Sequence, residues 1–229
     1  TVIGGNGAGK STMLNAIAGV FQVDSGTITI DGQDVTKLPE HKRAAFLGRV
    51  FQDPMMGTAP TMQIEENLAL AARRGQPRGL KWGITALERA DYRELLKTLD
   101  LGLEDRLTAK VGLLSGGQRQ ALTLLMASLK QPKLLLLDEH TAALDPKTAD
   151  KVLALSDQIV QENNLTTLMI THNMKDAIAH GNRLIMMDAG RVVVDISGED
   201  KKKLTVPDLL ALFSRASGSD EANDKMLLS

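Results

Sequence analysis

The chain has 229 residues, of which 43% are hydrophobic, so it can bury one substantial core and is expected to fold as a globular protein. Its formal net charge of -1 and isoelectric point near 6.4 provide no overall excess of positive charge for binding nucleic acid or an anionic membrane. The absence of cysteine excludes disulfides and thiolate metal sites, and no apolar run reaches the roughly 18 residues of a membrane-spanning helix.

The first segment predicts a strand, a glycine-rich loop and a helix. Residues 1–3 are β-prone, and residues 11–18 place Leu14 and Ile17 on one helical face before a stop at Gly19. The strand before the loop is unusually short, and the chain begins without an initiator methionine. We therefore expect the sequence to be incomplete at its N-terminus.

The loop between this strand and helix matches the eight-residue P-loop pattern, whose glycines let successive backbone N–H groups approach phosphate oxygens. A glycine-rich turn that matches by chance is the alternative, and the flanking strand and helix argue against it. Lys10 is expected to reach the β- and γ-phosphates of ATP, and Ser11 to bind Mg²⁺, with Thr12 as a supporting contact. The candidate nucleotide-binding residues are Gly4, Asn6, Gly7, Ala8, Gly9, Lys10, Ser11 and Thr12.

The next elements change from strands to helices. Residues 27–30 predict a short strand that enters a turn at Asp31-Gly32, and residues 47–51 predict another strand that ends before Pro54. Residues 62–130 then follow a helical period, interrupted by a stretch with glycine and proline. This pattern predicts a helical subdomain inserted in an α/β core.

The pentapeptide Leu-Ser-Gly-Gly-Gln stands at the predicted start of a helix in this region. A helix that opens with Ser-Gly-Gly presents unbonded backbone N–H groups and the positive end of its dipole, which suits a phosphate that its own chain does not already hold. We therefore expect a phosphate bound by another subunit to meet this end of the helix. The candidate residues are Ser115, Gly116, Gly117 and Gln118.

An apolar strand at residues 134–137 delivers two carboxylates, Asp138 and Glu139, at its C-terminal end. Open α/β sheets bind ligands at this end of their strands. Asp138 is expected to contact Mg²⁺, and Glu139 to act as the general base that polarises the attacking water. Solvated acidic residues are the alternative, which the upstream P-loop disfavours.

The remaining segments predict further strands alternating with helices, as in a parallel sheet. Thr205 and Asp208 resemble a capping box that opens a last helix through Phe213, and residues 214–229 are polar enough to fray. The predicted strands are residues 166–170, 184–187 and 192–194, and the predicted helices are residues 147–162 and 174–180.

Together these motifs resemble those of the nucleotide-binding subunits of ABC (ATP-binding cassette) transporters, in the family's order from residue 1 to about residue 195. The signature pentapeptide is specific to that superfamily. The resemblance implies a single α/β P-loop NTPase domain with a mainly parallel sheet and a small antiparallel β portion. Its parts are a core at residues 1–53 and 131–198, a helical subdomain with the signature at residues 54–130, and a C-terminal helix and tail at residues 199–229.

The resemblance assigns roles to residues that would otherwise be polar strand ends or loop residues. Gln52 matches the Q-loop glutamine, which contacts Mg²⁺ and water, and Asp145 matches the D-loop aspartate. His172 matches the switch histidine, which faces the γ-phosphate. Ser115 and Gly117 would face the ATP held by the partner subunit's P-loop. The implied catalytic residues are Lys10, Gln52, Glu139 and His172, and the implied metal ligands are Ser11, Gln52 and Asp138.

Three features depart from the family pattern or leave it open. His140 replaces the proline that usually follows the catalytic glutamate, and we assign it no chemistry. The aromatic residue that stacks on adenine would precede the first residue of this chain, so none is named. Met55, Met56 and Met62 follow Gln52 where the family receives the permease, although gap-filling within the helical subdomain is equally compatible.

The resemblance implies a bacterial importer subunit at the cytoplasmic face of the plasma membrane. Two copies would bind head to tail around ATP and Mg²⁺ and drive a separate integral membrane permease, which an extracytoplasmic binding protein supplies with substrate. The run from residue 134 to residue 146 resembles a subgroup whose permeases are like those for branched-chain amino acids and whose cargo includes aromatic amino acids. The alternative is a soluble ABC ATPase in assembly, repair or translation, which the single signature disfavours. An exporter would carry a fused membrane domain, and a sensor without turnover would not need Glu139.

Overall fold

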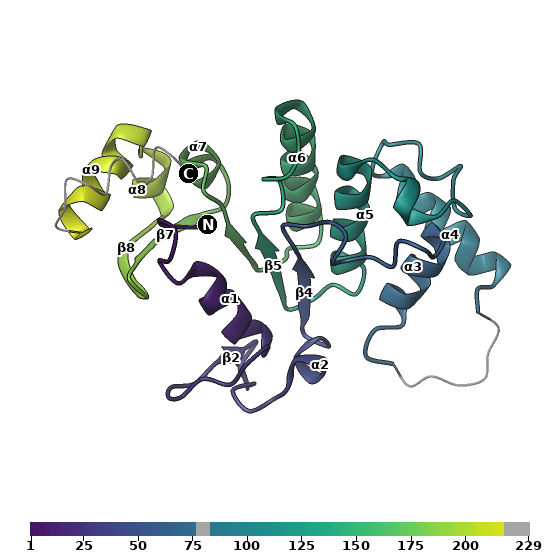
Figure 1. Cartoon of the computed structure of the whole chain (residues 1–229), viewed down its shortest axis with the longest axis horizontal. Helices are drawn as coiled ribbons and strands as arrows, with labels where there is room; N and C mark the ends of the chain where they lie inside the picture. Colours follow the sequence, from purple (N-terminus) through teal and green to yellow (C-terminus); the bar gives the residue numbers. More distant parts are fainter. Residues whose placement is uncertain (77–82, 218–229) are drawn as a thin grey trace. The chain divides into compact units, whose positions relative to one another are not determined.

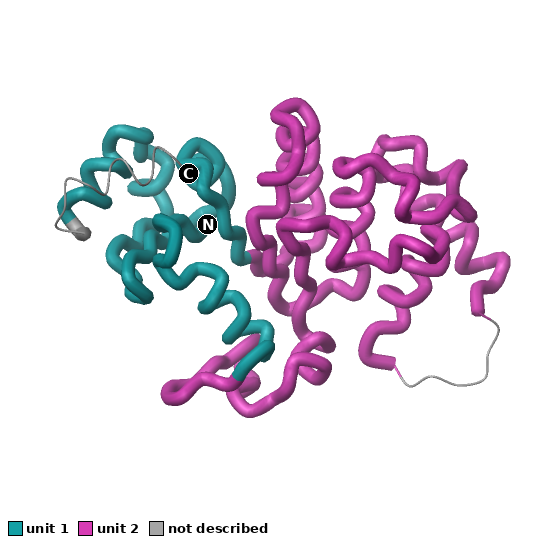
Figure 2. The backbone as a smooth tube through the Cα atoms, in the orientation of Figure 1, with its two compact units in different colours: residues 1–21, 168–229 teal, residues 22–167 magenta. Residues whose placement is uncertain are grey.

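The structure is a computed structural model that describes residues 1–76 and 83–217. It divides into two compact units, which we call unit 1 (residues 1–21 and 168–229) and unit 2 (residues 22–167), coloured separately in Figure 2. Each unit is described by itself, and the element labels are those of Figure 1.

Unit 1 is built on strands that flank the very short N-terminal strand. Strand β1 is paired in parallel on both sides, with Val2 opposite Ile170 of β6 and Ile185 of β7. Strand β8 pairs antiparallel with β7 through a turn at Ala189 and Gly190, both at positive φ. The elements are β1 (Val2–Ile3), α1 (Lys10–Ala18), β6 (Thr167–Ile170, which begins one residue before the unit), α7 (Met174–Ala179), β7 (Arg183–Asp188), β8 (Arg191–Ser197), α8 (Gly198–Lys202) and α9 (Val206–Ser217).

The helices of unit 1 begin and end much as the sequence predicts. Gly19 ends α1 in a left-handed conformation (φ 83), and its N–H bonds to Asn15 and Ala16 carbonyls. The predicted capping box at the start of α9 is present, since Asp208 Oδ2 accepts from the Thr205 backbone at 3.0 Å. The prediction that fraying begins at Ser214 is wrong for the first residues, because α9 continues to Ser217. The Ser214 hydroxyl donates to the helix carbonyl four residues earlier, at 3.2 Å, while residues 218–229 lie outside the described part of the chain.

Unit 2 joins a strand pair to a set of helices. Strands β4 and β5 run parallel, from Leu47 opposite Leu134 to Val50 opposite Leu137. The predicted turn at Asp31 and Gly32 is present, with both residues at positive φ, and it joins a small antiparallel hairpin. The elements are β2 (Thr29–Ile30), β3 (Gln33–Asp34), α2 (Glu40–Arg43), β4 (Leu47–Val50), α3 (Ile64–Ala72), α4 (Ala86–Lys97), a 3-10 helix η1 (Val111–Leu113), α5 (Gly116–Ser128), β5 (Leu134–Asp138) and α6 (Pro146–Glu162).

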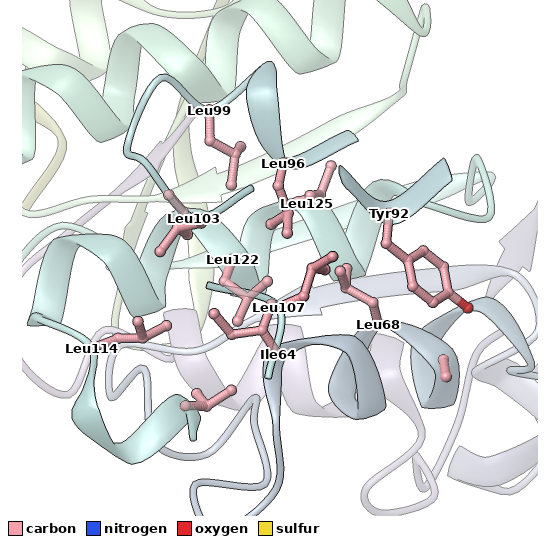
Figure 3. Close-up of a cluster of buried hydrophobic side chains, with 13 residues drawn as sticks. Ile64, Leu68, Tyr92, Leu96, Leu99, Leu103, Leu107, Leu114, Leu122 and Leu125 are labelled. Carbon is pink, nitrogen blue, oxygen red and sulfur yellow. The ribbon is translucent and has the colours of Figure 1, made fainter. Parts of the chain in front are cut away.

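The helices of unit 2 share a leucine-rich core. Figure 3 shows side chains from α3, α4, α5 and the loop before η1 pointing into one cluster, with the Tyr92 ring at its edge. The apolar face predicted from Ile64 and Leu68 is buried, since both residues are 0% exposed. The cluster consists of Ile64, Leu68, Ala69, Tyr92, Leu96, Leu99, Leu103, Leu107, Val111, Leu114, Ala121, Leu122 and Leu125.

Helix α5 also packs against the strand side of unit 2. It contacts β4 and α6, and a Cβ atom at Gly48 of β4 would lie 2.4 Å from the Ala127 carbonyl oxygen. Glycine is therefore needed where the strand and helix backbones approach closely. The mainly parallel pairing, the antiparallel hairpin and the surrounding helices confirm the predicted α/β class. The predicted subdomain boundaries stay a prediction, and part of the linker between α3 and α4, residues 77–82, lies outside the described residues.

Candidate active site

The glycine-rich loop of unit 1 connects β1 to α1, as predicted. The Ala8 N–H donates to the Gly5 carbonyl at 3.1 Å, and Gly9 adopts φ 95 immediately before the helix. The Lys10 ammonium group donates to the carbonyls of Gly4 at 2.7 Å and Gly5 at 3.2 Å, and the residue is only 7% exposed. The lysine charge is thus held within the loop that is predicted to receive phosphate.

The glycines of this loop fall into two groups. A Cβ atom at Gly4 would lie 2.3 Å from the Met187 carbonyl oxygen, and one at Gly9 would lie 3.2 Å from Gly190. At Gly5 and Gly7 a Cβ atom would meet no atom within 4 Å. The first group lets the loop pack on its own unit, while the second leaves open space, which fits an approaching phosphate.

Helix α1 presents exposed polar residues beside this loop. Ser11 and Thr12 occupy its exposed first turn, and Asn6 is exposed within the loop. Helix N-termini bind anions because their first N–H groups have no partner within the helix. The arrangement of the loop and the first turn of α1 therefore fits a nucleotide phosphate chain.

His172 lies in the same unit, directly after β6. The Thr171 N–H donates to the Val2 carbonyl at 3.2 Å, and the Thr171 hydroxyl accepts from the Asn173 N–H at 3.0 Å. Asn173 then caps α7 by accepting from Lys175 N–H at 2.9 Å. Since β1 and β6 are parallel neighbours, the P-loop and the exposed His172 leave the sheet at the same edge, where α/β proteins bind ligands.

Asp138 and Glu139 end β5 in unit 2, as the sequence predicts. The Arg49 guanidinium lies 3.3 Å from Asp138 Oδ2 and stacks 4.5 Å from the centre of the Phe51 ring. The side chains of this ion pair are only 15% and 16% exposed. A positive charge therefore holds one oxygen of the predicted metal-binding carboxylate in place.

The segment after β5 turns sharply toward α6. Glu139 has φ 46, a left-handed conformation that is uncommon for a residue with a side chain, and its carbonyl accepts from Ala142 N–H at 3.0 Å. Asp145 caps α6, with its Oδ1 accepting from Thr148 N–H at 3.1 Å. The hydrogen bonds from Thr148 lower the pKa of the Asp145 carboxyl below its ordinary value, because they favour the ionised form that caps the helix.

The signature residues form the N-terminus of α5. The Ser115 hydroxyl accepts from Gln118 N–H, and Gln118 Oε1 accepts from Ser115 N–H, both at 3.2 Å. This capping box orders the first turn while Ser115 and Gly116 remain exposed. Gly117 lies against α6, where a Cβ atom would stand 2.2 Å from Thr148 Cγ2. The signature and the D-loop segment are therefore adjacent within unit 2.

The Q-loop residue Gln52 is exposed just after β4. Gln120 of α5 donates to the Phe51 carbonyl at 3.1 Å, which ties the signature helix to the residue before Gln52. Met55 and Met56 are 41% and 68% exposed. The exposure of Met55 and Met56 fits a contact surface, whereas Met62 is only partly exposed, so both readings of the three methionines stay open.

The structure brings the predicted residues together in two groups. The P-loop and His172 belong to unit 1, whereas Gln52, the signature, the two carboxylates and Asp145 belong to unit 2. Sequence reasoning missed Arg49, although a lone arginine in a short apolar strand is a signal that could have pointed to it. It also missed the contact between His140 and Ser156, for which the sequence holds no local signal.

Each of the three residues proposed as metal ligands would bind the metal through an oxygen atom. Ser11 offers a hydroxyl, Gln52 an amide oxygen and Asp138 a carboxylate, which suits Mg²⁺ because that ion keeps several of its own waters. In the described part of the chain, no group of three or more histidine, cysteine or acidic residues could hold a metal ion.

Comparison with known proteins identifies the family. The model of the family described as "ABC transporter" matches residues 1–142. A tyrosine transport ATP-binding protein of Clostridioides difficile (strain R20291) is 50% identical over 216 residues, covering 94% of this chain and 86% of that protein. A methionine import ATP-binding protein of Rhizobium etli is 39% identical over 84% of this chain and 51% of that protein, so the chain spans about half of its length.

Solved structures agree with these matches. The ADP conformation of an ATP-binding cassette of an ABC transporter superposes with a TM-score of 0.73 at 25% identity, covering 93% of this chain and 85% of that one. A dimeric, post-hydrolysis cassette bound to ADP and Pi gives a TM-score of 0.71 at 30% identity, covering 86% and 83%. The family model, the close relatives and the P-loop geometry agree that the chain binds and hydrolyses ATP and belongs to the ABC transporter family, as an ATP-binding subunit.

Proposed function

We propose that this ATPase works as a pair of identical chains and powers the import of an amino acid through a separate membrane permease. The relative named as a tyrosine transport protein supports an aromatic amino acid as the cargo, and the methionine import relative supports amino-acid import in general. No helix in the described residues is long and apolar enough to cross a membrane. In this proposal the chain lies at the cytoplasmic face of the bacterial plasma membrane, and an extracytoplasmic binding protein delivers the cargo.

The observation that carries the paired arrangement is the exposed N-terminus of α5. Ser115 and Gly116 are exposed, and the capping box has already satisfied the Gln118 N–H. The remaining N–H groups of the first turn and the helix dipole suit a phosphate. We assign that phosphate to ATP held by the Lys10 loop of the partner subunit, in a head-to-tail pair. Asp145 would line the same interface.

On its own P-loop, the chain would hold the phosphates of ATP. The loop N–H groups from Gly5 onward and the Lys10 ammonium would contact the β- and γ-phosphates, with Ser11 and Thr12 at the first turn of α1. Binding would move Lys10 from the loop carbonyls that it now contacts to the phosphate oxygens. His172 would donate a hydrogen bond to the γ-phosphate.

The metal would be Mg²⁺, held by oxygens of Ser11, Gln52 and Asp138. When bound, this ion neutralises developing charge on the phosphates. Asp138 is suited to this role because Arg49 lies 3.3 Å from its Oδ2 and holds the carboxylate in place. Gln52 follows β4, which also carries Arg49. The same strand therefore positions both predicted metal ligands of unit 2, Gln52 directly and Asp138 through the ion pair with Arg49.

Glu139 would act as the general base. In hydrolysis it takes a proton from water, whose oxygen bonds to the γ-phosphorus while the bond to the β-phosphate oxygen breaks, releasing ADP and phosphate. The test is Glu139→Gln, which should lower the hydrolysis rate at least ~100-fold while ATP binding is retained. Glu162→Gln, at an exposed carboxylate of α6, is the matched control and should hydrolyse ATP normally. Normal turnover by Glu139→Gln would show that the base is misassigned.

The transport role is tested by reconstitution. The chain is copurified with the permease encoded beside it, placed in liposomes with the cognate binding protein, and supplied with labelled tyrosine, methionine or leucine. ATP-dependent uptake of tyrosine above the other two supports the proposed cargo. Failure to associate with any permease would instead favour a soluble ABC ATPase, an alternative that the transport relatives described above do not favour.

A further inference from the structure

His140 is fully enclosed beside the proposed general base. The residue is 2% exposed, and its Nε2 lies 2.9 Å from the hydroxyl oxygen of Ser156, which is 3% exposed on α6. The Ser156 hydroxyl donates its only proton to the Val152 carbonyl at 2.8 Å. With that proton on the Val152 carbonyl, we assign Ser156 as the acceptor and His140 Nε2–H as the donor.

Glu139, the residue before His140, has an unfavourable backbone conformation that other contacts must maintain. Glu139 adopts φ 46, a conformation that costs free energy for a residue with a Cβ atom and persists only where surrounding contacts enforce it. On one side, β5 holds the chain at Asp138. On the other side, the hydrogen bond from His140 fastens the next residue to the middle of α6.

The same turn is fastened to α6 a second time. Asp145 accepts from Thr148 N–H of α6 at 3.1 Å, while the bond from Ala142 N–H to the Glu139 carbonyl, at 3.0 Å, closes the turn on itself. The segment from Glu139 to Asp145 is therefore held by α6 at two separate points. The contact of His140 lies next to the proposed base, whereas the cap at Asp145 lies at the far end of the segment.

We propose that His140 and Ser156 form a positioning pair that holds Glu139 in its left-handed conformation and so aims its carboxylate at the attacking water. The proposal rests on the role of Glu139 as general base. A proline at position 140 would restrict the backbone through its ring. Histidine lacks that restriction, and the buried hydrogen bond to Ser156 supplies it instead.

The test compares turnover with binding in purified full-length protein. Ser156→Ala removes the acceptor without adding volume and should lower kcat for ATP hydrolysis about 10-fold, because a small misplacement of a catalytic group is costly. The dissociation constant for a fluorescent ATP analogue should change less than about twofold, because the contacts of Lys10 described above involve neither His140 nor Ser156. His140→Leu should give the same loss, and the two changes together should cost no more than either alone.

Two further variants separate positioning from general stability. His140→Gln keeps an N–H donor at a similar reach and should retain more activity than His140→Leu. Ile159→Val removes one buried methyl group from the same helix without touching the hydrogen bond of Ser156, and should leave kcat within about twofold of the unaltered protein. If Ile159→Val lowers kcat as much as Ser156→Ala at equal loss of thermal stability, the positioning role is wrong.

The remaining outcomes distinguish this proposal from the one on which it rests. Ser156→Ala with unchanged kcat, alongside an inactive Glu139→Gln, overturns the positioning pair and leaves the general base intact. Normal turnover by Glu139→Gln overturns the base assignment itself. If Ser156→Ala does not fold, the comparison of His140→Gln with His140→Leu decides, and equal activity of those two variants overturns the pair.

Discussion

The glycine-rich loop of unit 1 and the carboxylate and signature region of unit 2 are built by different means. Lys10 is held by the carbonyls of Gly4 and Gly5, within a few residues of itself. In unit 2, by contrast, Arg49 holds Asp138 across a strand pair, and Gln120 of α5 bonds to the Phe51 carbonyl 69 residues earlier.

This difference in construction indicates which substitutions should impair each region. Lys10 is held by its own loop, but Gly4 and Gly9 pack closely against Met187 and Gly190, so changes at these two glycines should disturb the packing of the loop on its unit. The region of unit 2 depends on how closely α5, α6 and the two strands approach, as at Gly117 and Thr148. Substitutions outside the motifs, on the facing elements, should therefore affect the carboxylate and signature region.

The largest effect is expected at Gly4. Alanine there would place a Cβ atom 2.3 Å from the Met187 carbonyl oxygen, a backbone atom that cannot move aside cheaply. Gly4→Ala should lower the free energy of unfolding by about 3 kcal/mol, measured by urea denaturation. Gly5→Ala is the matched control and should change it by less than about 1 kcal/mol, because no atom lies within 4 Å of its Cβ position. Equal losses would contradict the division of the loop glycines.

A smaller effect is expected where the signature meets α6. Gly117→Ala would place its Cβ atom 2.2 Å from Thr148 Cγ2 and should cost about 2 kcal/mol of stability. Thr148→Ser removes that methyl group and should restore most of the loss in the double variant, as measured by thermal unfolding and ATP hydrolysis. A double variant as unstable as Gly117→Ala would mean that the clash lies elsewhere. Gly116→Ala, whose Cβ would lie 3.3 Å from a leucine methyl group, should be milder.

The ion pair between α3 and α4 tests the helical part of unit 2. Glu65 is 4% exposed and receives two hydrogen bonds from the Arg89 guanidinium, at 2.6 and 2.8 Å. Glu65→Gln should lower the free energy of unfolding by about 1.5 kcal/mol, at the low end for charged hydrogen bonds because the Arg89 side chain is 45% exposed.

The same pair predicts a pH dependence. The hydrogen bonds from Arg89 lower the pKa of Glu65 below its ordinary value. The stabilisation is therefore complete above the unfolded-state pKa, near 4.5, and is lost as the pH falls through the lower folded-state pKa. Urea unfolding of Glu65→Gln should show a shallower loss of stability below pH 4.5 than the unaltered protein. Parallel curves would contradict the assignment.

The smallest effects should be alike in the two units. Thr85 caps α4 in unit 2, accepting from Glu88 N–H at 3.2 Å, and Thr205 caps α9 in unit 1, accepting from Asp208 N–H at 3.4 Å. Thr85→Ala and Thr205→Ala should each cost about 1 kcal/mol in thermal unfolding, because capping is local in both. Markedly unequal costs would show that the cap contributes to tertiary packing in one unit.

Much of the fold and the site is predictable where the signal is local. The strand, loop and helix around Lys10 follow from glycine spacing and helical period, and the hairpin turn follows from Asp31-Gly32. The end of α9 is not predicted, because three of the residues 214–217 are polar and yet the helix continues. Composition alone does not show that Ser214 bonds back to the helix that precedes it.

The sequence by itself determined the motifs, the caps and the class of chemistry, since these depend on residue types at fixed spacing along one backbone. Only the tertiary structure decided that Arg49 pairs with Asp138, that His140 meets Ser156, and that Gly117 must be a glycine. These contacts arise where separate elements pack together. Close packing, rather than local preference, sets which distant side chains meet there.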